Sequence, residues 1–328
     1  MFWSILGILV VLAIAAVFGA AIAMFRIAMV RPKNHKPFDG DGSPVWEETL
    51  QQINAGREWF MEQNPRRVYV FSRDGLRLEG WFLPHPEAER TVICVHGYHS
   101  EGLRDYGAAV PYYYSTKSNL LVIDQRSHGG SEGKYIGFGV LERWDLVEWI
   151  HWVNGEFGDE FPIVLSGISM GSATVMMTLG LSLPDNVCAA VADCGYSSLW
   201  NQFAYTLDKR YHLPAKLILP CAEMISRMVT GVDFRSVSPE KELERCKIPV
   251  LFIHGAKDGV VPMTETTDHT YPACRTAKKL IIVDEAAHGM SYSLERERCQ
   301  KGLEWALTRK MKASEWDNLY TADERVKL

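Results

Sequence analysis

Six short apolar segments follow one another through the middle and end of the chain, and helix-forming segments separate them. Each is apolar at nearly every position, which is typical of a strand that helices cover on both faces of a sheet. Alternation of such strands with helices predicts a parallel sheet with right-handed crossovers. The six segments are 91–97, 119–126, 161–167, 187–195, 248–255 and 279–286.

A different pattern precedes these segments. After Pro65, hydrophobic and polar residues alternate over residues 66–83 around Asp74-Gly75, which predicts an antiparallel hairpin. Two antiparallel strands followed by six parallel ones therefore make up the predicted sheet. The sequence predicts an α/β domain over residues 65–310, with a mostly parallel eight-stranded sheet and helices on both faces.

The first apolar segment is far longer than a strand. Residues 2–25 carry no charge, and as a helix they would extend about 36 Å, enough to cross a hydrocarbon core of about 30 Å. We therefore expect a transmembrane anchor at 1–26. A cleaved signal peptide is the alternative, although only residues 21–23 offer a small-residue cleavage site. All nearby basic residues follow the segment, so the positive-inside rule predicts that the soluble part of the chain faces the cytoplasm. These residues are Arg26, Arg31, Lys33 and Lys36.

Residues 27–64 are expected to connect this anchor to the domain. Their first part is polar and rich in Pro and Gly, as in a linker. The second part places Trp46, Leu50 and Ile53 at near-helical spacing, which predicts an amphipathic helix packed on the domain. A polar tail at 311–328 ends the chain.

One crossover is too long for a helix and two loops. About fifty residues separate the fourth and fifth parallel strands, and they are helical, aromatic and Met-rich in pattern, with breaks at Pro214 and Pro220. This composition predicts a small helical cap at about 197–245, over the carboxyl edge of the sheet where pockets form. A peripheral helical insertion is the alternative.

Composition and charge exclude several classes of protein. With 47% apolar and 23% charged residues, the chain is globular rather than disordered. A net charge of −5 and the lack of a basic stripe argue against nucleic-acid binding. The seven cysteines are scattered without metal-site spacing, which indicates buried thiols of a reducing compartment and no zinc site.

The pattern G-x-S-x-G occurs twice, around Ser131 and around Ser169. Ser169 directly follows the apolar segment "FPIVLSGI" and directly precedes the helix former "SATVMMTLGL". A nucleophile elbow needs this strand-turn-helix context, since the sharp turn exposes the serine and the helix N-terminus faces the developing oxyanion. Ser131 lies in a glycine-rich loop instead. The context therefore favours Ser169 as the nucleophile.

A serine hydroxyl needs a base and a group that orients the base, and in this type of fold both follow later in the chain. Asp258 follows the penultimate predicted strand, and His288 follows the last one. Asp193 is the alternative acid. Asp284 and Glu285 are too close in sequence to His288 to orient it easily, and His128 and His254 are expected to be structural histidines.

The oxyanion of an acyl-transfer intermediate needs two backbone N–H donors. We expect one from Met170, directly after the nucleophile, and one from Tyr98 in the loop after the third strand. The Tyr98 and Met290 side chains are candidates for lining the substrate pocket.

The sequence stretches around these candidate residues are similar to those of a known family. The chain resembles the α/β-hydrolases, and within them it is similar to bacterial membrane-anchored serine hydrolases related to the cinnamoyl/feruloyl esterase and serine aminopeptidase branches. The resemblance covers residues 91–293. It implies Ser169, Asp258 and His288 as the catalytic triad and a structural role for the loop that holds Ser131. The matching stretches are "VHGYHS", "DQRSHGGSEGKYIGFG", "GISMGSATVMM", "ADCGYSS", "LFIHGAKDGVVP" and "AAHGMSYS".

The sequence thus predicts a membrane-anchored serine hydrolase, a carboxylesterase acting on small acyl esters without a metal or organic cofactor. A thioesterase or a serine peptidase would use the same triad. An aminopeptidase would need an acidic site for the substrate amine, for which Glu223 in the cap is the candidate. A hydrolase-like binding scaffold is a third hypothesis, but it predicts an incomplete triad. The oligomeric state stays open.

Overall fold

The computed structural model describes residues 2–33 and 43–308. The predicted tail at 311–328 and most of the polar linker lie outside the described residues.

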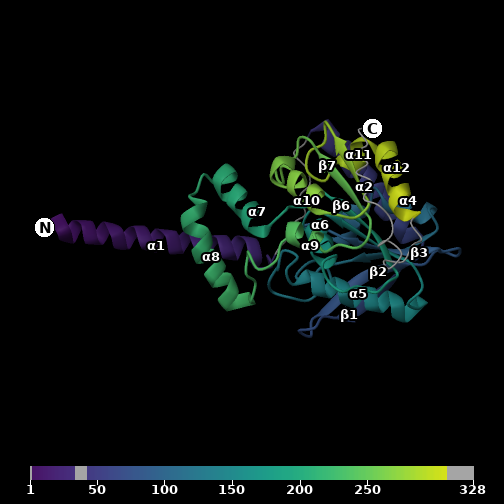
Figure 1. Cartoon of the computed structure of the whole chain (residues 1–328), viewed down its shortest axis with the longest axis horizontal. Coiled ribbons are helices and arrows are strands. Elements are labelled where there is room, and N and C mark those ends of the chain that lie inside the picture. The colour runs from purple at the N-terminus through teal and green to yellow at the C-terminus, as the bar shows by residue number, and fades with distance from the viewer. Residues whose placement is uncertain (1, 34–42, 309–328) are drawn as a thin grey trace.

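The sheet has eight strands in the order β1-β2-β4-β3-β5-β6-β7-β8 (Figure 1). β1 pairs antiparallel with β2, and β2 pairs antiparallel with β4, whereas all the other neighbours are parallel. This confirms the predicted two antiparallel and six parallel strands. The strands are β1 Arg66–Phe71, β2 Arg77–Leu83, β3 Arg90–Val95, β4 Ser118–Ile123, β5 Ile163–Ile168, β6 Val187–Asp193, β7 Val250–Gly255 and β8 Lys278–Val283.

Helices cover both faces of the sheet, which is why the parallel strands are apolar throughout. On one face, one hydrophobic cluster joins the strands to α5 (Glu142–Phe157), α6 (Met170–Thr178), α9 (Pro239–Leu243) and α10 (Thr267–Ala273). On the other face a second cluster joins them to α2 (Pro44–Glu62), α3 (Gly102–Tyr106), α4 (Val110–Ser115) and α12 (Arg296–Leu307). Two short helices, a 3-10 turn at Met263–Glu265 and α11 (Ser291–Leu294), lie in the last loops.

Helix α1 (Phe2–Met29) projects from the body of the protein, and its N-terminal part extends alone (Figure 1). Its length and apolar composition are sufficient to cross a membrane. Its C-terminal part packs against α8 (Ala215–Thr230), where Ala21, Phe25 and Met29 join a third hydrophobic cluster. The same cluster contains residues of α7 (Leu199–Tyr205) and of the π-helix at Thr206–Arg210. Within the long crossover, α7, the π-helix and α8 therefore lie beside α1.

The end of α1 is also fixed to the body of the domain through the loop after β4. Val30 forms an isolated antiparallel bridge with Tyr135. The Arg31 guanidinium donates hydrogen bonds to the carbonyl oxygens of Ser131 (2.6 Å) and Gly129 (2.8 Å). A planar guanidinium that binds two acceptors holds its backbone in a defined position.

Candidate active site

Ser169 lies at the sharp turn between β5 and α6. Its backbone has φ 56° and ψ −118°, a strained conformation for a residue other than glycine. A Cβ atom at Gly171 would lie 2.0 Å from the carbonyl oxygen of Val95, and one at Gly167 would lie 2.4 Å from that of Gly171. Only glycine fits at these two positions, so the G-x-S-x-G spacing follows from the tightness of the turn.

The three residues of the predicted triad are hydrogen-bonded in series. His288 Nε2 lies 2.8 Å from Ser169 Oγ, and His288 Nδ1 lies 2.7 Å from Asp258 Oδ2. Asp258 comes from the loop after β7 and His288 from the loop after β8, and both loops lie at the edge of the sheet where β5 ends in Ser169. Residues far apart in the sequence therefore meet in the order that nucleophilic catalysis requires.

The electrostatics of this site favour a charged carboxylate and a basic imidazole. Burial alone would raise the pKa of Asp258, but hydrogen bonds from His254 and His288 and from the Val261 amide hold it well below its ordinary value. Burial would lower the pKa of His288, but the hydrogen bond and the negative charge of Asp258 raise it above its ordinary value. A carboxylate that orients and stabilises an imidazolium acts in this way.

Asp193, the second candidate for the acid, is at the end of β6 and is 7% exposed. Burial raises its pKa to about 7. Its backbone carbonyl oxygen accepts a hydrogen bond from the Ser169 amide at 2.9 Å, whereas His288 Nδ1 is held by Asp258. Asp193 thus contributes to the position of the elbow, and the structure brings Asp258 rather than Asp193 to the imidazole.

Ser131 and the remaining histidines and acids of the sequence pattern have structural surroundings. The Ser131 hydroxyl is buried, donates to the carbonyl oxygen of Asp124 at 2.5 Å and accepts from the amide of Glu79 at 2.8 Å. His254 lies between Thr267 Oγ1 and the carbonyl oxygen of Val261. The other three candidates make contacts elsewhere than at the His288 imidazole. His128 Nε2 accepts a hydrogen bond from the His99 amide, Glu285 pairs with Lys257, and Asp284 is exposed.

The loop after β3 lies against the elbow. A Cβ atom at Gly97 would lie 3.1 Å from Cβ of Ser169, so glycine permits this close approach. The Gly97 amide donates to Asp105 Oδ2 at 2.6 Å, and Asp105 Oδ1 accepts from Ser100 Oγ at 2.5 Å. Asp105 therefore fixes the loop that carries Tyr98. Met170 begins α6, so its amide has no acceptor within the helix.

A metal ion does not fit this site well. Cys194, Asp258 and His288 offer ligand atoms within 4.8 Å of one another. However, the histidine and the aspartate are hydrogen-bonded to each other, and burial raises the pKa of the Cys194 thiol well above its ordinary value. Metal binding would need the thiolate and would break the hydrogen bond that orients the imidazole.

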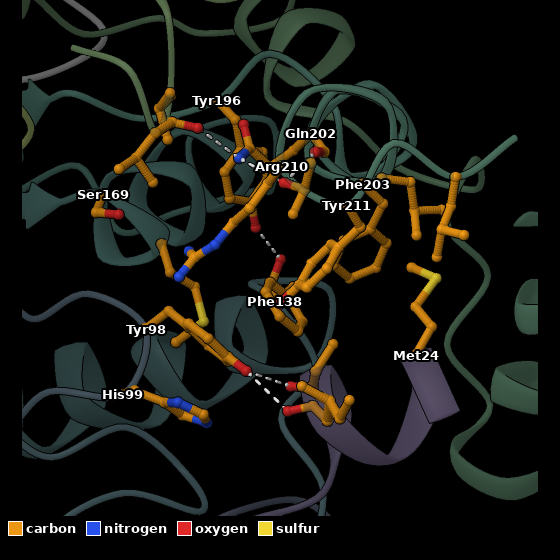
Figure 2. A pocket seen from close by; sticks show the side chains of 18 of the residues that line it. Met24, Tyr98, His99, Phe138, Ser169, Tyr196, Gln202, Phe203, Arg210 and Tyr211 are labelled. Atoms are coloured by element: carbon orange, nitrogen blue, oxygen red, sulfur yellow. Dashed lines mark hydrogen bonds between the residues drawn. The ribbon is translucent and has the colours of Figure 1, made fainter. Parts of the chain in front are cut away.

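Two cavities meet at Ser169 and Tyr98. The first has a volume of about 420 Å³ and is enclosed mainly by apolar side chains of α1, α7 and the π-helix (Figure 2). The second has a volume of about 590 Å³ and is lined by α2, the loop after β3 and the His288 loop. Its lining is also mostly apolar, and the polar side chains in it include Ser100, Arg104, Asp105 and His288. His99 and Arg210 line both cavities. A molecule bound at Ser169 can therefore extend into either cavity.

Of the two residues predicted to line a substrate pocket, one lines these cavities and the other does not. Tyr98 lines both cavities. The expectation for Met290 was wrong: its side chain is 3% exposed and packs in the cluster with α12, because Gly289, at φ 70°, turns the chain inward. Glu223 lines neither of these cavities and lies 3.7 Å from Arg235, which compensates its charge. The residues of α1 in the first cavity were not expected.

Comparisons with known proteins support the fold. Residues 90–214 match a family described as alpha/beta hydrolase fold. The uncharacterised protein YqkD of Bacillus subtilis is 28% identical over 254 residues, which are 76% of this chain and 83% of that protein. The putative esterase YitV of the same organism is 28% identical over 65% of this chain and 87% of its own length.

Solved structures give the same result. The Pyrococcus furiosus esterase Pf2001 superposes with a TM-score of 0.62 at 22% identity, covering 88% of this chain and 98% of that one. The Pyrococcus horikoshii acylaminoacyl peptidase superposes with a TM-score of 0.56 at 20% identity, covering 76% and 42%. The chain has the α/β-hydrolase fold, with a mostly parallel sheet of eight strands and esterases among its structural neighbours.

Proposed function

We propose that the protein is a serine hydrolase that cleaves carboxylic esters through an acyl-enzyme on Ser169. The observation that carries this proposal is the hydrogen-bonded series from Ser169 Oγ through His288 to Asp258, at 2.8 and 2.7 Å, with the serine in the strained backbone conformation of an elbow. A small acyl ester is the substrate class, and the esterases among the relatives and structural neighbours support the reaction class.

In the proposed reaction, Ser169 Oγ attacks the acyl carbonyl carbon and its proton passes to His288 Nε2. The tetrahedral intermediate collapses when the leaving alcohol takes this proton, and the acyl group remains on the serine. A water molecule then gives a proton to His288 and attacks the acyl carbon. The bond between this carbon and Ser169 Oγ breaks as His288 returns the proton to Oγ, which releases the carboxylic acid and restores the serine. Asp258 holds the imidazole through Nδ1 and stabilises its charged form.

The oxyanion of each intermediate would be bound by the amides of Met170 and Tyr98. Two features support these donors. The Met170 amide opens α6, where the helix dipole is positive, and Asp105 holds the loop that leads into Tyr98.

We further infer that α1 is retained as a membrane anchor with the catalytic domain in the cytoplasm. Cleavage after residues 21–23 would remove Ala20 and Ala23 from the wall of the first cavity and Ala21 from the third hydrophobic cluster. The basic residues that follow the apolar segment support the orientation. All seven cysteines are free thiols and six of them are buried, which fits a reducing compartment.

A thioesterase or a peptidase would use the same three residues. An aminopeptidase would need an acidic residue at the site to bind the substrate amine. Glu223 is poorly placed for this role, since it pairs with Arg235 and lies outside the two cavities. The apolar first cavity favours an acyl group over a charged amino group at Ser169.

A fluorophosphonate probe tests the nucleophile, because it forms a stable bond with an activated serine. We expect the full-length protein to react, Ser169→Ala to be unreactive and Ser131→Ala to react as the wild type does. Ser131 is the matched control, since it lies in the second copy of the same sequence pattern. Equal labelling of wild type and Ser169→Ala would show that the nucleophile is wrong.

The bond type can be tested with matched p-nitrophenyl esters, thioesters and aminoacyl p-nitroanilides of the same acyl group. The proposal expects the largest kcat/KM for the esters. A larger value for the anilides would replace the esterase by a peptidase, and a larger value for the thioesters would replace it by a thioesterase.

A further inference from the structure

One face of the last turns of α1 forms a wall of the first cavity beside Ser169. The residues that line the cavity recur every three or four positions, so they lie on one side of the helix. They are small or apolar and include Ala20, Ala23, Met24, Ile27 and Ala28. Figure 2 shows Met24 at the side of the cavity opposite Ser169. The apolar helix is therefore part of the site as well as an anchor.

The length of α1 places the membrane boundary at this cavity. The helix has 28 residues. A hydrocarbon core of about 30 Å takes about 20 of them. The uncharged segment ends at Phe25, before Arg26, and the buried residues of the helix begin at Ala21, so the end of this span lies where the helix becomes buried. The segment that leaves the bilayer is thus the segment that encloses the cavity.

Helix α8, which packs beside this part of α1, has an unusual distribution of apolar residues. Ile218, Leu219 and Ala222 are buried in the cluster with α1. Its outer face is apolar as well, since Leu217 is 58% exposed and Met228 is 78% exposed. Residues 217, 224 and 228 have helical spacing, so they form one continuous exposed surface. We call Leu217, Met224 and Met228 the outer face of α8.

An exposed apolar surface next to a membrane-spanning helix is suited to the bilayer boundary. The outer face of α8 belongs to a helix that packs on α1 just where α1 would leave the hydrocarbon core. Basic side chains of the same helix, Lys216 and Arg227, are exposed and could contact anionic headgroups. This continuity argues for lipid, rather than a second protein, as the partner of this surface.

The two cavities leave room for both sides of an ester. The first is lined mainly by apolar side chains. The second is largely apolar as well, although Arg104, Asp105 and His288 also line it. With the ester carbonyl at Ser169, an acyl chain fits the first cavity and the alcohol part lies in the second.

We propose that the substrate is a long-chain acyl ester that resides in the membrane, and that its chain reaches Ser169 along the face of α1 that lines the first cavity. This inference rests on the proposed ester hydrolysis at Ser169. Chain and enzyme then meet at the bilayer boundary, so the chain need not cross water.

Substitutions on α1 test the acyl site. Full-length protein in phosphatidylcholine–phosphatidylglycerol vesicles is given p-nitrophenyl palmitate or p-nitrophenyl butyrate. Each methylene that enters an apolar site is worth up to about a fourfold gain in binding. We therefore expect wild type to prefer palmitate, and Ala23→Trp to lower the palmitate-to-butyrate ratio of kcat/KM by about tenfold or more.

Ala15→Trp is the matched control, because Ala15 lies on the exposed part of α1 away from the cavity. Ala15→Trp should leave kcat/KM for palmitate and for butyrate within about twofold of the wild-type values. Ala20→Phe, a smaller insertion on the same face, provides a second test if Ala23→Trp does not fold. Fluorophosphonate labelling reports an intact nucleophile. If both cavity variants are labelled and their palmitate-to-butyrate ratios of kcat/KM equal that of wild type, the acyl site is wrong and the proposed hydrolase stands. If wild type shows no hydrolysis that depends on Ser169, the proposed hydrolase itself is wrong.

The outer face of α8 is tested with Met228→Asp, and Leu294→Asp is its control, since Leu294 is an exposed leucine of α11, outside the long crossover that contains α8. We expect Met228→Asp to slow the hydrolysis of vesicle-bound palmitate about tenfold or more relative to butyrate, and Leu294→Asp to leave the ratio unchanged. An unchanged ratio in Met228→Asp would overturn the membrane contact. A dimer in detergent that Met228→Asp converts to a monomer would also overturn it, since this face would then join two copies of the chain.

Discussion

The side-chain hydroxyl of Tyr98 donates a hydrogen bond to the backbone carbonyl oxygen of Ala28, with 3.0 Å between the two oxygens. It also lies 3.1 Å from the carbonyl oxygen of Ile27 (Figure 2). Carbonyl groups in the last turn of a helix have no partner within the helix, so the tyrosine satisfies them. Burial raises the pKa of Tyr98 and keeps the hydroxyl protonated. The end of α1 is thereby joined to the loop that carries the proposed oxyanion donor.

Replacement of Tyr98 by phenylalanine removes this hydrogen bond and retains the ring, which stacks on Phe138 at 4.9 Å between centroids. Two carbonyl oxygens at the end of α1 lose a donor. We expect Tyr98→Phe to lower the Tm of the detergent-purified protein by about 2–6 °C. We expect kcat for p-nitrophenyl butyrate to fall less than about tenfold, because the backbone amide remains. Tyr69→Phe, at a half-exposed tyrosine of β1, should change neither quantity.

The two carboxylates at the site can be separated by matched substitutions. Asp258→Asn removes the charge that orients His288, so kcat should fall by about 10³–10⁴-fold. Asp193→Asn should retain activity within about fivefold, since the contact that Asp193 makes with Ser169 comes from its backbone carbonyl group. The activity of each variant is measured from initial rates of ester hydrolysis and from the rate of labelling with fluorophosphonate. A larger loss for Asp193→Asn than for Asp258→Asn would reverse the assignment of the acid.

The pH dependence of kcat/KM follows from the raised pKa of His288. The imidazole must be neutral to accept the proton of Ser169, so activity is present above this pKa and is lost as the pH falls through it. The carboxylate of Asp258 raises the pKa of His288, and the acid limb should therefore have its midpoint above about 6.5. In the residual activity of Asp258→Asn this midpoint should move to lower pH. A midpoint that stays in place would mean that another group controls the acid limb.

The parts of the molecule that could be predicted from the sequence are those with a local signal. Apolar runs predicted the six parallel strands, and alternation around Asp74 predicted the hairpin. The choice of Ser169 over Ser131 also depended on immediate neighbours, namely a strand before and a helix after. Asp258 and His288 could be placed because parallel strands end at one edge of the sheet.

The remainder depends on how distant elements pack. The sequence of α1 is uniformly apolar. A helix that only spans a membrane and a helix that also forms the wall of a cavity have this same pattern, so the sequence does not distinguish them. Arg31 was interpreted only as a charge next to the membrane, but its guanidinium binds two carbonyl groups about a hundred residues away in sequence. Met290 follows His288 closely, yet the turn at Gly289 directs it into the core. Glu223 was the candidate for binding a substrate amine only in the aminopeptidase alternative, and in the structure it lies 3.7 Å from Arg235.

Asp105 is a positioning residue whose effect should appear in kcat rather than in KM. Its two carboxylate oxygens accept the Gly97 amide and the Ser100 hydroxyl, and this pair of bonds fixes the loop that leads into Tyr98. Asn at this position offers one acceptor oxygen, and its NH₂ group would face one of the two donors. The Tyr98 amide would then move away from the oxyanion, which develops only in the transition state.

We expect Asp105→Asn to lower kcat for p-nitrophenyl butyrate by about 10–100-fold with a change in KM below about threefold. The fluorophosphonate reaction should slow by a similar factor, because it too develops negative charge on an oxygen beside Ser169. Asp208→Asn, at an exposed aspartate of the π-helix, is the control for the removal of one negative charge. A general loss of folding would reduce the fraction of protein that is labelled, whereas a displaced oxyanion donor would reduce the rate constant of labelling. The labelling time course therefore separates these two effects. A change in KM alone, with kcat unchanged, would show that Asp105 contacts the substrate instead of positioning the oxyanion donor.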